Sequence, residues 1–555
     1  MNNRFSTQLE ILSGWITSLQ YEDIPERVVY YAKLQLLDCV AAICAGARSD
    51  VGVRLKRSLE STESGGPCTL LPTGEKWSLD NTLFYHSAMI NSLELDSFVF
   101  MGHMGQSAVS TSLALTEILD RDGRDLLLAM VAAIEVGARL SAYMASGPHQ
   151  GHMRAFIHRI AGAAIVSKLH GADEMTTANA MAIALSMPEF PLFPASYSPD
   201  TKVICTGPPV VEGVKAGFMA LGGLDAARDI VENPVGFFHF FSYDRNVPDI
   251  WGRIGQSWTV PTLSVKRFAT CAYAQGPVSA ALELHDSLNA APDEIESVDI
   301  YGPIVTVILE KFSRPHHGAS LTPVNTHFST IRSVAATLLH GELTGEFYRE
   351  GAFETKIGPI EALSERMRLL YSWPMSMNLL RGLDAGIENA GKPGILGSTS
   401  GQKTMKQFSR AFGSRPLLQW SDIPALARIS AADRTYFVRR HLRSMMARFR
   451  QVDWTDSDRS HASAEGDLER IAFRFGGRVE LFLKNGRRES AECDIPPGFT
   501  DDPDREEIVE QKFLRESAPV WGSERSRQVL RIIRQIEKHT TRELLNTLDK
   551  VNDDK

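Results

Sequence analysis

The first half of the chain is a succession of apolar segments with helical spacing. From the N-terminus to about residue 260, runs rich in Ala, Leu, Ile and Met alternate with short turns that carry Gly and Asp, such as Asp120–Gly123. The pattern predicts helices over residues 24–46, 108–120, 124–145, 155–170, 175–187 and 208–222. Helices of this kind bury their apolar faces against one another, so this part of the chain is expected to form a mainly α domain.

The pattern changes near residue 264. Residues 294–305 alternate apolar and polar side chains and are enriched in β-branched residues, which is typical of a strand. Two further strand-like runs lie on either side of Asn485-Gly486, a pair that favours a tight hairpin. Helices are predicted near 325–340 and 432–449, and again from about 505 to 550.

The chain of 555 residues is too long for one compact core. We expect a mainly α fold, with a large all-helical domain made of residues 1–263 and 503–555. Residues 264–502 are expected to form a smaller α+β domain. Within it, residues 385–420 are rich in Gly, Ser and Pro, which indicates an irregular insertion.

Charge and hydropathy exclude several classes of function. The net charge of −8 is mild for this length, and no stripe of Lys and Arg with interleaved aromatic residues is present, so we expect no nucleic-acid partner. The N-terminus lacks the pattern of a secretory signal. No uninterrupted apolar run approaches the ~20 residues of a membrane span, so we expect a cytoplasmic protein with no membrane partner.

The cysteines and histidines do not follow the spacing of a metal site. The six cysteines are scattered, and neither a C-x-x-C pair nor an H-E-x-x-H motif occurs. A zinc finger or an iron–sulfur cluster needs clustered thiolates, and a disulfide framework is rare in a long, cysteine-poor chain. We therefore expect chemistry without an iron–sulfur cluster and without a bound metal.

The most informative segment for chemistry covers residues 91–108. It places Glu94, Asp96 and His103 in otherwise apolar surroundings, with a glycine on each side of the histidine. Ionisable groups that are desolvated by packing have shifted pKa values and often mark acid/base sites. The alternative is a capped helix N-terminus with a surface histidine.

A second cluster of chemical groups precedes the helix predicted over 155–170. This cationic loop suits an anionic ligand, because the free N–H groups of a helix N-terminus add to its charge. The alternative is a solvated polar loop. Its members are His149, His152, Arg154, His158 and Arg159.

Three more segments carry cations or a hydroxyl next to predicted helices. Lys202 lies in a loop bounded by Gly and Pro, where a lone lysine is more often simply solvated. Lys266 and Arg267 lie where helical character gives way to mixed character, and domain junctions often host clefts. The last segment contains His327, Ser329 and Arg332.

In chain order, these segments resemble the MmgE/PrpD family, which includes 2-methylcitrate dehydratase, cis-aconitate decarboxylase and iminodisuccinate epimerase. The resemblance covers about residues 8–350 and 475–550. Six segments carry it: Leu37–Gly46, Asp96–Met104, His152–Ala164, Asp200–Gly207, Val265–Cys271 and Phe328–Arg332.

The chain departs from the family pattern at several places. Met104 replaces a proline, Arg332 replaces a tyrosine, and His152 lies about one residue from the expected spacing. Residues 366–450 have no counterpart, so we expect an insertion there. Because the spacing of His152 is shifted, His149 and His158 remain rival candidates for the second active-site histidine.

The resemblance implies a homodimer whose large helical domain and smaller lid domain bind a polycarboxylate between them without a cofactor. It assigns acid/base roles to Asp96, His103 and His152. It implies a substrate-binding set of Lys202, Lys266, Arg332, Cys271, His149 and His158.

The reaction implied first is dehydration of a citrate-like hydroxy acid, as in 2-methylcitrate dehydratase. Decarboxylation or epimerisation on the same fold is the alternative. A non-catalytic ligand-binding relative is the third possibility, and retention of His103, Lys202 and Lys266 argues against it.

Overall fold

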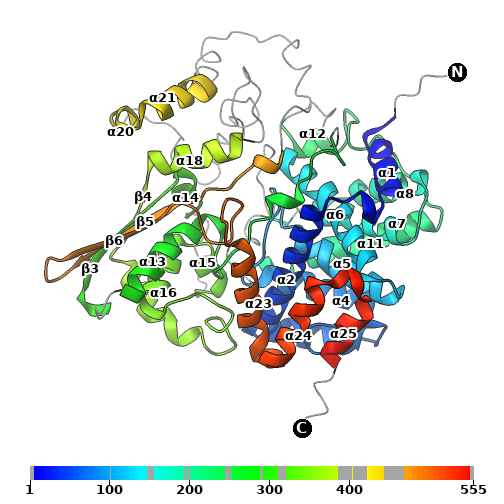
Figure 1. Cartoon of the computed structure of the whole chain (residues 1–555), viewed down its shortest axis with the longest axis horizontal. Coiled ribbons are helices and arrows are strands. Elements are labelled where there is room, and N and C mark those ends of the chain that lie inside the picture. Colours follow the sequence, from blue (N-terminus) through cyan, green and yellow to red (C-terminus); the bar gives the residue numbers. More distant parts are fainter. Residues whose placement is uncertain are drawn as a thin grey trace. The chain divides into compact units, whose positions relative to one another are not determined.

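The chain folds into two compact units, described here from a computed structural model (Figure 1). Unit 1 comprises Met1–Ser196, Asp200–Val265 and Glu506–Lys555, and unit 2 comprises Tyr197–Pro199 and Lys266–Arg505. The structure describes residues 6–100, 102–144, 147, 155–189, 191–192, 195, 197, 200–243, 251, 253–287, 292–310, 321–385, 403, 422–442 and 468–549.

Unit 1 is built of helices, and the six helices predicted in its sequence are confirmed to within three residues at their ends. The helices are α1 (Gln8–Ser18), α2 (Glu26–Ala47), α3 (Asp50–Glu60), α4 (Leu79–Ser92), α5 (Gly105–Ile118), α6 (Gly123–Met144), α7 (Phe156–Leu169), α8 (Glu174–Ser186), α10 (Thr201–Ile204), α11 (Gly207–Leu221), α12 (Phe237–Phe241), α23 (Arg505–Trp521), α24 (Ser523–Arg534) and α25 (Thr541–Asp549).

Local sequence explains where several of these helices begin and how closely they pack. Thr7 and Glu10 form a reciprocal capping box at the start of α1, and Asp173 caps α8 through the amide of Thr176 at 2.7 Å. The helix α11 packs against α7. The two backbones are so close that a Cβ at Gly213 would come within 2.4 Å of the carbonyl oxygen of Arg159. Small residues therefore bring the backbones of the core helices together.

Among the described residues, α2 is the one helix long and apolar enough to cross a membrane by length and composition. Most of it is buried inside the protein, as is typical of a core helix. Its polar residue Asp38 is fully buried and ion-paired.

The C-terminal helices of unit 1 pack on its N-terminal helices, and Figure 1 shows the red C-terminal segment beside blue α2. Trp521 donates a hydrogen bond to the carbonyl of Pro72 at 3.0 Å, and the hydroxyls of Thr541 and Thr116 lie 2.9 Å apart. The two ends of the sequence thus share one core.

Unit 1 also contains a two-stranded antiparallel sheet that we did not predict, formed by β1 (Cys68–Leu70) and β2 (Glu75–Trp77). Strands of three residues are too short to show the alternation that identifies a strand in a sequence. The rest of the described part of unit 1 matches the expected helical character.

Unit 2 combines one mixed sheet with helices, which confirms the predicted mainly α fold with a smaller α+β part. The strand order is β4 (Met367–Tyr371), β3 (Ile295–Gly302), β5 (Gly477–Leu483), β6 (Arg488–Cys493). The helices are α13 (Gln275–Ser287), α14 (Ile304–Leu309), α15 (Pro323–His327), α16 (Thr330–His340), α17 (Ile357–Ser364), α18 (Trp373–Asp384), α20 (Ile423–Arg428) and α21 (Ala431–Phe437).

The predicted hairpin is confirmed. The amide of Leu483 donates to the carbonyl of Arg487 at 3.0 Å, and Gly486 has a φ of 84°, which favours glycine. Along β5, buried residues alternate with partly exposed ones, and α13 packs on β5 and β6.

The start of the expected insertion contributes to the sheet. The strand β4 pairs in parallel with β3. The next helix, α18, contributes Trp373 to an apolar cluster that also contains Ile308 and Phe437. A parallel pair needs a long connection, so its register is not visible in the local sequence. Residues 386–402 and 404–421, which include most of the Gly-, Ser- and Pro-rich stretch, lie outside the described residues.

Candidate active site

The candidate site of unit 1 is built on the loop between α4 and α5. Two non-glycine residues of this loop, Glu94 and Phe100, have left-handed backbones with φ of 52° and 56°. Such conformations cost on the order of 1–3 kcal/mol each and persist where surrounding contacts impose them. Here the amide of Phe100 donates to the hydroxyl of Thr262 at 2.8 Å, and Phe98 pairs with Ser264 through two backbone hydrogen bonds.

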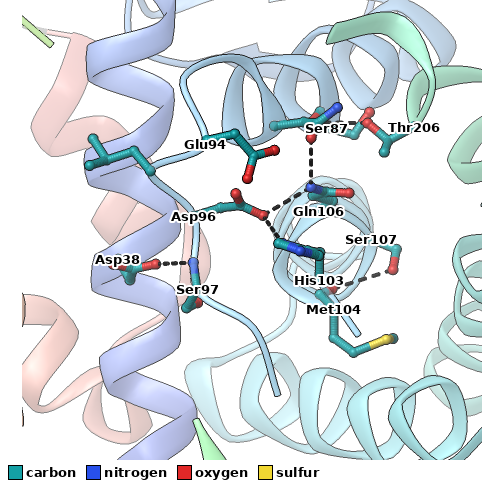
Figure 2. A network of polar contacts seen from close by, with 12 residues as sticks. Asp38, Ser87, Glu94, Asp96, Ser97, His103, Met104, Gln106, Ser107 and Thr206 are labelled. Carbon is teal, nitrogen blue, oxygen red and sulfur yellow. Dashed lines mark hydrogen bonds and ion pairs between the residues drawn. The ribbon is translucent and has the colours of Figure 1, made fainter. Parts of the chain in front are cut away.

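The loop brings Asp96 to His103. Oδ2 of Asp96 lies 2.8 Å from Nδ1 of His103, and the same oxygen accepts a hydrogen bond from Nε2 of Gln106 at 2.9 Å. Figure 2 shows the carboxylate pointing at both side chains. Both partners lie at the N-terminal end of α5, where the helix dipole favours a negative charge.

The two members of this pair differ in exposure. The Asp96 side chain is 1% exposed and the His103 side chain is 32% exposed. Within the part of the chain that the structure describes, Nε2 of His103 makes no hydrogen bond. A carboxylate on Nδ1 holds the proton on that nitrogen and leaves Nε2 to accept or donate a proton. An imidazole oriented in this way can act chemically as an acid or a base.

Lys202 is joined to this pair through Asn91 and Gln106, and it forms an ion pair of its own. Its ammonium is 2.5 Å from Oε1 of Glu94, it also donates to the carbonyl of Asn91, and its side chain is 1% exposed. Asn91 connects the lysine to the acid/base pair, because its Oδ1 accepts from Gln106 at 3.2 Å. The charge of Lys202 is therefore balanced by that of Glu94.

Of the three histidines predicted around the cationic loop, His158 is among the residues that the structure describes. Nδ1 of His158 lies 3.0 Å from the hydroxyl of Ser107, so this buried histidine joins α7 to the first turn of α5. His149 and His152, together with Arg154, lie outside the described residues. Their roles stay predictions.

The remaining predicted residues belong to unit 2. Lys266 is the first residue of the main segment of unit 2, Lys266–Arg505, and its side chain is fully buried. The amide of Cys271 donates to the carbonyl of His327 at 2.8 Å. Arg332 pairs with Glu361 at 2.6 Å.

An unpredicted carboxylate, that of Glu310, follows α14 directly and contacts the start of α16 in unit 2. It accepts hydrogen bonds from the hydroxyl of Ser329 at 2.5 Å and from the amide of Thr330 at 2.6 Å. Burial raises its pKa to about 7, although these hydrogen bonds oppose the shift. Glu310 is therefore a partly exposed carboxyl group whose pKa lies near neutrality.

Comparison with known proteins relates the first half of the chain to a known family. The MmgE/PrpD N-terminal domain matches residues 10–249, which include the Asp96–His103 pair and Lys202. Residues 10–249 therefore carry the N-terminal domain of the MmgE/PrpD family.

The relatives that the chain matches share low identity with it. Cis-aconitate decarboxylase of Aspergillus terreus (strain NIH 2624 / FGSC A1156) is 27% identical over 49% of this chain and 58% of the relative. Cis-aconitate decarboxylase of Homo sapiens is 26% identical over 41% and 49%. A cis-aconitate decarboxylase-like protein of Aspergillus oryzae (strain ATCC 42149 / RIB 40) is 22% identical over 62% and 76%. The chain thus spans only about half of the first and second of these relatives.

Several residues around the Asp96–His103 pair were not predicted from the sequence. Gln106 lies three residues after His103, so its place on the first turn of α5 was a usable signal. Asp38 appeared only as part of a matching motif. Lys512, which contacts Asp38, is 474 residues away along the chain and had no local signal.

Proposed function

We propose that this chain is a cofactor-independent lyase that removes CO2 from a small unsaturated polycarboxylate of the cis-aconitate class. The observation that carries the proposal is the one-third exposed His103 held by the buried Asp96. The names of the matched relatives favour decarboxylation over the dehydration that we expected first.

The pair can supply the proton that this reaction needs. When the bond between a carbon and its carboxylate breaks, CO2 leaves and the electron pair stays on that carbon, delocalised toward a neighbouring carboxylate. Protonated His103 then transfers a proton from Nε2 to carbon, and Asp96 stabilises the imidazolium before that transfer. His103 regains its proton from solvent.

Dehydration uses the same pair in the opposite order, with His103 first removing a proton next to a carboxylate. Epimerisation needs only removal and return of that proton. The products therefore separate the three reactions, while the Asp96–His103 geometry supports each of them.

The experiment is an NMR assay of the full-length protein in D2O with cis-aconitate, citrate and 2-methylcitrate. Decarboxylation releases CO2 and gives a product with one deuterium from solvent. Dehydration of citrate or 2-methylcitrate gives an unsaturated acid without CO2. Binding by calorimetry without turnover of any of the three acids, in a folded protein, would show a ligand-binding relative instead.

We also expect the activity to survive prolonged chelation and aerobic handling. Within the described residues, no three His, Cys, Asp or Glu side chains are placed to hold a metal ion. Loss of activity on chelation that is restored by iron or zinc would contradict this part of the proposal.

A further inference from the structure

A buried ion pair contacts the backbone of the two residues that flank Asp96. The ammonium of Lys512, on α23, is 2.6 Å from Oδ1 of Asp38, on α2, and both side chains are at most 1% exposed. Lys512 also donates to the carbonyl of Leu95, and Oδ2 of Asp38 accepts from the amide of Ser97 at 2.8 Å. Figure 2 shows the contact between Asp38 and Ser97.

These contacts hold the backbone on both sides of Asp96. The carbonyl of Leu95 belongs to the peptide unit that precedes Asp96, and the amide of Ser97 belongs to the unit that follows it. Since peptide units are planar, fixing both units restricts the backbone of Asp96 and the direction of its side chain. The Lys512–Asp38 pair therefore acts on the carboxylate that contacts His103.

Such a pair is costly to bury. Taking two charges out of water costs several kcal/mol per ion, and well-packed apolar residues often replace a buried pair without loss of stability. Burial lowers the pKa of Lys512, while the negative charge of Asp38 opposes that shift. Stability alone is thus a weak reason for an ion pair at this place.

We propose that Lys512 is a positioning residue: acting with Asp38, it holds the backbone from Leu95 to Ser97 so that the Asp96 carboxylate fixes the Nδ1–H tautomer of His103. The C-terminal segment thereby completes the acid/base pair of the N-terminal helices. The catalytic part of this inference rests on the proposed function, but the tautomer of His103 does not.

The test replaces Lys512 by methionine and, in a second variant, makes the double substitution Asp38→Leu/Lys512→Met. The double variant leaves no unpaired buried charge, so it is expected to fold even where Lys512→Met alone does not. The readouts are the 15N shifts of labelled His103, assigned by comparison with His103→Ala, and the pH profile of kcat/KM.

We expect the fraction of His103 in the Nδ1–H tautomer to fall in both variants. With an active enzyme, we expect kcat to fall roughly 10- to 100-fold, with KM within about twofold, because positioning acts on the chemical step. The acid limb of the kcat/KM profile should move, which a purely structural role would not cause.

Lys33→Met is the matched control. Lys33 also joins α2 to the C-terminal segment, through Glu537 at 2.5 Å and the carbonyl of Arg534 at 3.0 Å, but has no contact with the Asp96 loop in the described structure. It should lose stability without changing the tautomer. A wild-type tautomer of His103 in the Lys512 variants would overturn the proposal. Turnover of no substrate by the wild-type protein would contradict only the proposed function, because the NMR measurement needs no activity.

Discussion

Asp96 and His103 are seven residues apart in the chain, and Oδ2 of the aspartate lies 2.8 Å from Nδ1 of the histidine. The carboxylate is buried, while part of the imidazole is exposed. Water is therefore kept from the group that orients the ring, and the ring itself can exchange a proton with a substrate.

His103→Ala should lower kcat roughly 10²- to 10⁴-fold, as typical for a lost general acid or base. Steady-state kinetics on a polycarboxylate that the wild-type protein turns over measures the effect. His539→Ala is the control, because His539 also has a carboxylate near Nδ1, Glu543 at 3.3 Å, and is 35% exposed. Near-wild-type turnover of His103→Ala would remove it from the mechanism and favour His152.

Lys266→Ala should mainly raise KM, with kcat little changed, if the lysine holds a substrate carboxylate in the ground and transition states alike. A charged hydrogen bond contributes about 1.5–3 kcal/mol, so a roughly 10- to 100-fold increase is expected. Arg267→Ala is the control, since Arg267 is one-third exposed and paired with Glu342 at 2.9 Å. An unchanged KM together with lower thermal stability would indicate a structural role for Lys266.

Glu310 should make the stability of the protein depend on pH. Its pKa is raised from 4.5 to about 7 in the folded protein, so the native state binds more protons than the unfolded state between these values. Its contribution is fully present below pH 4.5 and is lost as the pH rises through 7. The free energy of unfolding should thus fall by about 3 kcal/mol between these limits.

Urea denaturation at a series of pH values measures this effect. Glu310→Gln should flatten the dependence, because the amide keeps a hydrogen-bond acceptor and cannot ionise. Glu361→Gln serves as the control, since Glu361 is 42% exposed. The same slope in Glu310→Gln as in the wild type would exclude Glu310 as its source.

Gly105→Ala should destabilise unit 1 by about 1–3 kcal/mol, the usual cost of overpacking. Gly105 begins α5, and a Cβ there would lie 2.3 Å from Sγ of Cys39 on α2. Gly14→Ala, in α1, is the matched substitution, because its nearest neighbour would be 3.8 Å away. Differential scanning calorimetry compares the melting temperatures of the two variants. Equal values would contradict the prediction and show that α2 and α5 can shift apart to accommodate the added methyl group.

Features that depend on near neighbours were predictable. The helices of unit 1 follow from apolar spacing over three or four turns, and the hairpin at Asn485-Gly486 follows from a two-residue turn signal. The contact between Asp96 and His103 joins two residues of one short loop that precedes a helix. The order of the motifs along the chain was enough to indicate the family.

Features that depend on distant partners were decided by the tertiary structure. Lys202 was predicted as a cation for substrate, and the fold pairs it with Glu94, 108 positions earlier. Lys512 reaches Asp38 across 474 positions, and β4 joins β3 in parallel after a long connection. The sequence by itself determined the helices, the hairpin and the family, because short-range backbone and side-chain preferences govern them. Only the packed core determined which buried charges meet, because the cost of burying a charge depends on the partner that folding brings to it.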